Sequence, residues 1–176
     1  MEMAATVTTS QLVALGVAGI ACAVDLRTRR IPNLLTFGAA AGALVFHFAT
    51  GGSSGLGNAA GGWLAGAAML MVPYALGGMG AGDVKLLAAL GAWLGPMDAF
   101  WTGIYASVAA GVMGVAIAYG SGYLRQALTN VWFMLTTWRA VGLKPIPELT
   151  LAAGRGPRLA YAAPILVGTV AVLWLQ

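Results

Sequence analysis

The chain has 176 residues, of which 60% are hydrophobic and 8% charged, against roughly 25% charged residues in an average soluble domain. This composition excludes a soluble globular enzyme and indicates a protein embedded in a lipid bilayer. The net charge is +4, but membrane topology accounts for the basic residues, so we expect no nucleic acid as a partner. The lone cysteine, Cys22, excludes an internal disulfide and a thiolate zinc site.

Six apolar stretches follow one another along the chain, separated by glycines, prolines and charged residues. Each predicts a helix, because a lone strand cannot satisfy its backbone in lipid and the alternation of a β-barrel is absent. The stretches cover about residues 9–24, 34–49, 57–76, 84–94, 99–120 and 159–175. We therefore expect an all-α polytopic membrane protein with about six transmembrane helices, forming a single domain over residues 1–176.

The basic residues all fall on one side of this predicted topology. They follow the first stretch, begin the fourth and precede the sixth, whereas the opposite connections around 50–56 and 95–98 have none. By the positive-inside tendency this side is cytoplasmic, which leaves both termini outside. The nine residues are Arg27, Arg29, Arg30, Lys85, Arg125, Arg139, Lys144, Arg155 and Arg158.

The connection over residues 121–158 is the only sizeable polar region. Within it, apolar side chains recur at a spacing of four and three residues, opposite polar ones, which predicts an amphipathic helix lying in the membrane interface between the last two transmembrane helices. The apolar positions are Leu124, Leu128, Val131, Leu135 and Trp138. This helix either covers an active site or only floats at the surface.

Two of the five acidic residues, Asp25 and Asp83, each stand at the end of an apolar stretch on the predicted cytoplasmic face. A carboxylate near hydrocarbon is costly unless it is paired or hydrated, so each is a candidate functional residue. The structural alternative makes Asp83 a helix N-cap and Asp25 a helix-end residue that snorkels beside arginines. Two such residues on one face favour function.

The fourth predicted helix is short, and a glycine-rich segment precedes it. From Asp83 to residue 97 it would reach about 22 Å, less than the roughly 30 Å hydrocarbon core. Asp83 is therefore expected below the cytoplasmic surface, with residues 77–82 lining a wet crevice that Gly80 and Gly82 shape. Two carboxylates around one water molecule there predict peptide hydrolysis of the aspartic protease type.

Both aspartates lie in recognisable motifs. Asp25 is followed by a basic stretch and Ile31-Pro32-Asn33, and Asp83 stands in Gly80-Ala81-Gly82-Asp83-Val84-Lys85-Leu86. In these motifs the chain resembles the type IV prepilin peptidases, which belong with the GxGD membrane aspartic proteases. The resemblance covers about residues 12–174 and implies that Asp25 and Asp83 are catalytic.

This resemblance also implies a substrate and a location. The enzyme would cleave the basic leader from prepilins, ahead of their hydrophobic stem, on the cytoplasmic side of the bacterial inner membrane. With one cysteine and no segment of paired CxxC motifs, the chain looks like the short, peptidase-only form found with tight-adherence (Flp) pili. No cofactor is implied, and the partners are prepilin substrates and the lipid bilayer.

Three neighbouring residues are assigned to shaping the site. Lys85 either holds the aspartates electrostatically or snorkels to the interface. Pro32 and Asn33 are expected to shape the turn into the second helix.

Two other functions remain open at this stage. A proton-coupled carrier would use the same aspartates as a proton relay through glycine-loosened helices. An assembly scaffold for pilus machinery would instead depend on the 121–158 connection.

Overall fold

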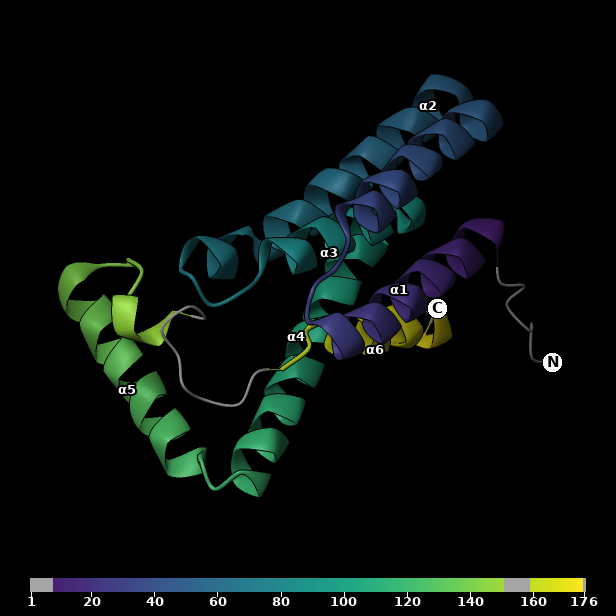
Figure 1. The fold of residues 1–176 in the computed structure, drawn as a ribbon. Coiled ribbons are helices and arrows are strands. Elements are labelled where there is room, and N and C mark those ends of the chain that lie inside the picture. Colours follow the sequence, from purple (N-terminus) through teal and green to yellow (C-terminus); the bar gives the residue numbers. More distant parts are fainter. Residues whose placement is uncertain (1–7, 151–158, 176) are drawn as a thin grey trace.

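A computed structural model describes residues 8–150 and 159–175 of the chain. Within these ranges the protein contains helices and no strand, which confirms the all-α prediction. Three of the helices, α1, α2 and α4, are long and apolar enough to cross a membrane. The elements are α1 (Thr9–Thr28), α2 (Asn33–Ala75), α3 (Ala81–Leu94), α4 (Pro96–Gly120), α5 (Leu124–Val141), the short 3₁₀ helix η1 (Pro147–Leu149) and α6 (Ala162–Leu175) (Figure 1).

Helix α1 has well-defined ends. The Thr8 side chain accepts a hydrogen bond from the Gln11 backbone, and the Gln11 side chain accepts one from the Thr8 backbone, so the first turn is capped reciprocally. At the other end Arg29 adopts a left-handed conformation with φ of 54°. The helix therefore continues past the predicted end at residue 24 and carries Asp25 in its last turns.

Helix α2 is a hairpin of two antiparallel arms. Its 43 residues would span about 65 Å if straight, roughly twice the hydrocarbon core. The chain instead reverses at Gly52, where φ is 59° and ψ is −144°, and the Gly55 backbone then lies directly against the His47 carbonyl. Figure 1 shows the two arms side by side. They correspond to the second and third predicted helices, but the loop expected over 50–56 is wrong, because helical structure continues to a much tighter turn.

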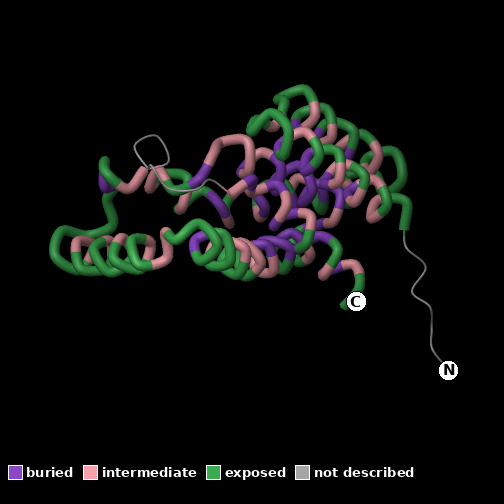
Figure 2. The backbone as a smooth tube through the Cα atoms, turned by 60° about the horizontal axis from the view of Figure 1, so that its bottom comes forward, coloured by how far each residue is buried: buried purple, intermediate pink, exposed green. Residues whose placement is uncertain are grey.

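The short helix α3 is the centre of the molecule. Nine of its 14 residues are buried, and it packs against α1, α2 and α4. The backbones of Gly62 on α2 and Gly91 on α3 are in direct contact, so neither position has room for a side chain. Small residues of this kind let helices approach closely where lipid supplies no hydrophobic driving force. The buried residues gather around α3 (Figure 2).

Helices α4 and α6 complete the bundle. Pro96 follows Gly95, whose φ is 89°, and opens α4, so the external loop expected over 95–98 is already partly helical. Helix α6 packs on α4 and α1, with the Gly168 backbone against the Thr102 carbonyl. It starts at Ala162, three residues later than predicted.

Helix α5 extends away from the bundle and has no buried residue (Figures 1 and 2). It confirms that the 121–158 connection contains a helix; its place in the membrane interface stays a prediction. After α5 the chain turns back, and the Trp138 indole N–H donates to the Lys144 carbonyl over 2.9 Å. The basic residues Arg155 and Arg158 lie outside the described residues.

Candidate active site

Asp25 is a buried carboxylate, with 6% of its surface exposed. It sits near the end of α1, where the chain meets the start of α6. Its Oδ2 accepts a hydrogen bond of 3.4 Å from the Ala162 backbone N–H. Buried carboxylates are retained only with such partners, so α6 is part of the environment that holds Asp25 in place.

Asp83 lies in the first turn of α3. Its Oδ2 accepts a 3.3 Å hydrogen bond from the Gly80 backbone N–H, which precedes the helix. The N-cap residue of α3 is thus Gly80, so the expected N-cap role of Asp83 is wrong; Asp83 is the third residue of the helix and accepts the N-cap backbone N–H. A side chain at Gly80 would place its Cβ 3.2 Å from this oxygen. Glycine at this position keeps the carboxylate uncrowded.

The two carboxylates come together in the fold. Helix α1 packs on α3, and Asp25 lies within electrostatic range of the Asp83 carboxylate. Helix capping alone would not require a second acid nearby. The structure thus brings together the two residues that the sequence singled out, although a long stretch of chain separates them.

Residues of the two motifs also contact each other. A Cβ on Gly82 would lie 3.3 Å from the Ile31 side chain, so glycine lets the first motif pack closely there. The Lys85 ammonium donates a 3.0 Å hydrogen bond to Asn33 Oδ1 and lies 5.3 Å from the centre of the Phe37 ring. Asn33 opens α2, and Lys85 lies on α3, so this bond links the two elements beside the aspartates.

Pro32 occupies the N-cap position of α2, with φ of −63° and extended backbone. Its carbonyl accepts hydrogen bonds from the Leu35 and Thr36 backbones in the first turn. The predicted role of Pro32 and Asn33 in shaping the entry to this helix agrees with these positions.

The sequence reasoning did not identify Tyr161, which lies immediately before α6. Its hydroxyl forms a hydrogen bond with Ser107 on α4, and it lies within electrostatic range of Asp83. Ser107 in turn donates a 2.7 Å hydrogen bond to the Gly103 carbonyl. The only signal in the sequence is a lone hydroxyl where the last apolar stretch begins, and nothing in that pattern connects it to Asp83.

Within the described residues, no three His, Cys, Asp or Glu side chains gather as metal ligands would. The polar groups available for chemistry at this place are the two carboxylates, the Tyr161 hydroxyl and the backbone of the glycine loop, residues 77–80. Paired acids can exchange protons with a water molecule between them.

Comparison with known proteins decides the family. A model of the type IV leader peptidase family matches residues 12–115. The chain belongs to the type IV leader peptidase family. The matched region is more than half of the chain and contains both aspartates and both motifs, so the resemblance inferred from the motifs is confirmed. Comparisons with curated proteins and with solved structures give no match.

Membership in the type IV leader peptidase family makes the protein a peptidase that acts on prepilin substrates. Together with the long apolar helices, it indicates a membrane protein. Many large apolar side chains on α1, α2 and α4 are exposed in the isolated chain, as expected for surfaces that face lipid.

Proposed function

We propose that this protein is a membrane aspartic endopeptidase that removes the basic leader from Flp-like prepilins with Asp25 and Asp83 as its catalytic pair. The observation that carries the proposal is their convergence: a buried carboxylate from α1 and the first-turn carboxylate of α3 interact electrostatically. Family membership supports the leader peptidase reaction. The use of the two aspartates as the catalytic groups is what we add to that reaction.

In the proposed mechanism the two aspartates hold one proton between them and bind one water molecule. The ionised carboxylate takes a proton from the water as its oxygen attacks the scissile carbonyl carbon, and the protonated carboxyl group donates its proton to the carbonyl oxygen. Collapse of the tetrahedral intermediate breaks the C–N bond, and the leaving amine takes up a proton.

Neighbouring backbone groups position the pair. The Ala162 N–H fixes Asp25 and the Gly80 N–H fixes Asp83. Gly80 leaves room for the Asp83 carboxylate, and Gly82 leaves room for Ile31 of the first motif at the start of α3. The bond between Lys85 and Asn33 holds the start of α2 against α3, so these residues shape the site without taking part in the chemistry.

The proposal includes a topology. The reaction takes place at the cytoplasmic face of the bacterial inner membrane, with both chain termini outside, the whole chain acting as one domain and α5 lying in the interface. The basic residues at the end of α1 and those on and after α5 support this orientation by the positive-inside tendency.

Single Asp→Asn variants in liposomes test the function. Asp25→Asn and Asp83→Asn should each reduce prepilin cleavage by at least about a thousandfold, as expected when a catalytic group is removed. Asp98→Asn, in the first turn of α4, is the matched control and should keep activity. Proton flux is measured on the same liposomes.

Loss of cleavage with no flux in any variant supports the peptidase. Wild-type proton flux that both substitutions abolish, with cleavage unaffected, would instead identify a proton-coupled carrier. Aspartate substitutions that change neither cleavage nor proton flux would favour the assembly scaffold.

A further inference from the structure

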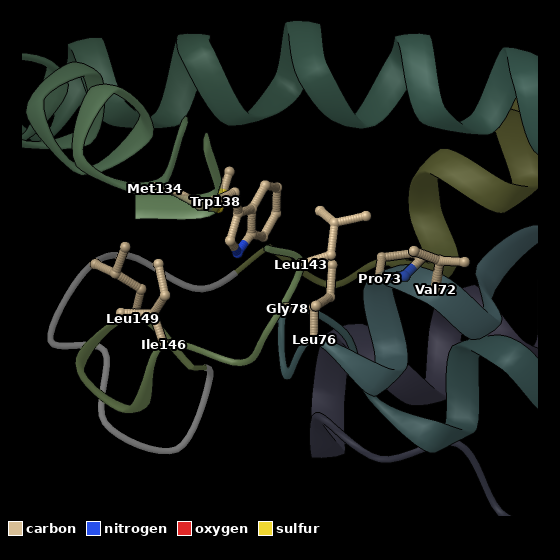
Figure 3. Close-up of a pocket in the computed structure, with 9 residues that line it drawn as sticks. All are labelled: Val72, Pro73, Leu76, Gly78, Met134, Trp138, Leu143, Ile146 and Leu149. Carbon is tan, nitrogen blue, oxygen red and sulfur yellow. The ribbon is translucent and has the colours of Figure 1, made fainter. Parts of the chain in front are cut away.

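A cavity of about 390 Å³ lies beside the candidate active site (Figure 3). One wall is the end of α2 and the glycine loop that follows it. The other wall is α5 with the chain that leads into η1. Figure 3 shows residues from the two walls around the cavity, among them Leu76 and Gly78 on one side and Met134, Trp138, Leu143 and Ile146 on the other.

The chemistry of this cavity specifies an apolar occupant. Its lining consists of aliphatic, Met, Pro and Trp side chains and one glycine. The one side-chain nitrogen among them, Nε1 of Trp138, already donates to the Lys144 carbonyl. A polar occupant would therefore lose its hydrogen bonds to water without replacement. The volume falls in the range of roughly 300–1,000 Å³ that is usual for ligand pockets.

The glycine loop links the cavity to the candidate active site. Gly78 lines it, and Gly80, two residues later, donates to Asp83. Since adjacent Cα atoms are about 3.8 Å apart, the Cα atoms of Gly78 and Gly80 are separated by about 7.6 Å at most. An extended substrate advances about 3.3 Å per residue, so about three residues of it reach from the carboxylates to the cavity.

The outer wall is packed onto the same loop. Gly77 has φ of +77°, and a Cβ there would lie 2.7 Å from the Thr150 side chain, just after η1. The cavity is therefore enclosed between the loop that leads into α3 and the segment that follows α5. A peptide whose scissile bond lies at Asp83 and that extends along this loop enters the cavity, which favours the substrate chain over lipid as its occupant.

We propose that this cavity is a substrate subsite that takes apolar side chains of the polypeptide substrate within about three residues of the scissile bond. The inference rests on the proposed function, because it uses Asp83 as the point of cleavage. It assigns to the α5–η1 segment a share in substrate specificity, which neither the motifs nor the family match provides.

The subsite is tested by placing a positive charge on the substrate and a negative charge in the cavity wall. The full-length protein in liposomes cleaves prepilin variants in which single residues, up to three on either side of the scissile bond, are replaced by Lys. The enzyme variant is Met134→Glu, in the cavity wall. The matched control is Thr129→Glu, an exposed position on the polar face of α5 outside the cavity. Wild-type cleavage and an Asp25→Asn blank are measured in parallel.

We expect one or more Lys positions to lower wild-type kcat/KM by about tenfold or more, because an apolar pocket rejects an unpaired charge. Met134→Glu should lower kcat/KM on the unmodified prepilin by a similar factor and recover at least part of it on the matching Lys substrate. Thr129→Glu should keep the wild-type preference. Leu143 also lines the cavity and is 67% exposed, so a substitution there should be tolerated by the fold. Leu143→Glu should therefore show the same loss of kcat/KM on unmodified prepilin and the same recovery on the Lys substrate.

The subsite would be overturned if Met134→Glu and Leu143→Glu lowered kcat/KM equally for all substrates, or if neither variant changed it. A dependence on the lipid acyl chain in place of the substrate side chain would also overturn it and assign the cavity to lipid. If the wild type cleaves and Asp25→Asn does not, such results reject the subsite alone. If the wild type cleaves no prepilin, the proposed function fails and the subsite with it.

Discussion

Helices α3 and α5 stand at opposite extremes of burial in this protein. Nine of the 14 residues of α3 are buried, whereas α5, described along its whole length, buries none of its 18. Helix α3 carries Asp83 and is enclosed by other helices; α5 contacts α4 and faces the end of α2 across the cavity. Chemistry that requires fixed geometry is therefore placed on the most constrained helix.

The same difference indicates where the protein can adapt. Segments with few buried contacts open at low cost, and they often carry elements that move or bind variable ligands. The α5–η1 segment fits a surface that selects substrates, since its side chains can change without disturbing the aspartates. Substitutions that are equivalent in chemistry should thus have very different effects in the two regions.

The sharpest form of this comparison uses two tryptophans. Trp93 on α3 is 8% exposed and donates a 2.9 Å hydrogen bond to the Ala39 carbonyl, while Trp132 on α5 is 70% exposed. Trp93→Ala should lower the free energy of unfolding by about 3–5 kcal/mol. Trp132→Ala should change it by about 0.5 kcal/mol or less. Denaturant unfolding in detergent micelles measures both, and similar losses would contradict the division into two regions.

The close contact between α2 and α3 is expected to be almost as sensitive. Gly62→Ala places a methyl group onto the Gly91 backbone and should cost about 1–3 kcal/mol of stability. Gly111→Ala on α4 is the control, because nothing lies within 4 Å of the added atom. That variant should be neutral or slightly stabilising, since alanine favours helix. Thermal unfolding of both variants distinguishes a packed from an open glycine.

The hydroxyl of Tyr161 should affect activity moderately. Tyr161→Phe removes the hydrogen bond with Ser107 next to Asp83, which is worth about 1 kcal/mol. We expect kcat/KM for prepilin to fall roughly fivefold, with a changed pH profile. The exposed Tyr119→Phe is the control and should match the wild type. If Tyr161→Phe lowers the free energy of unfolding but leaves the pH profile of kcat/KM unchanged, Tyr161 has only a packing role.

The smallest effect is expected at the link between the motifs. Lys85→Met breaks the exposed hydrogen bond to Asn33 and should reduce stability and cleavage by about 1 kcal/mol or less. Asn33→Ala should do the same, and the double variant should be no worse than either single one. Additive losses would show that the two residues act independently.

Local sequence patterns were sufficient to identify the acids and the main helices. Asp25 and Asp83 stood out because carboxylates are rare in this composition, and the positive-inside tendency placed both on one side. In the folded chain the helices that carry them, α1 and α3, pack against each other. The all-helical class followed from the cost of unsatisfied backbone in lipid.

Features that depend on long-range packing were not accessible in this way. The reversal at Gly52 could not be located, because several glycines in that segment could each allow a turn. Tyr161 reaches the site only because α6 packs between α1 and α4. The apolar cavity likewise arises from the return of the chain after Trp138, which no sequence periodicity encodes.

The most direct test of the central claim is a double-mutant cycle on prepilin cleavage. Two aspartates acting on one water molecule form a single catalytic unit, and removing a second member of such a unit costs little once the first is gone. We predict that Asp25→Asn/Asp83→Asn retains about the same residual rate as the slower single variant. A double variant slower by the product of the two single effects would show that the carboxylates act separately and would contradict the shared site.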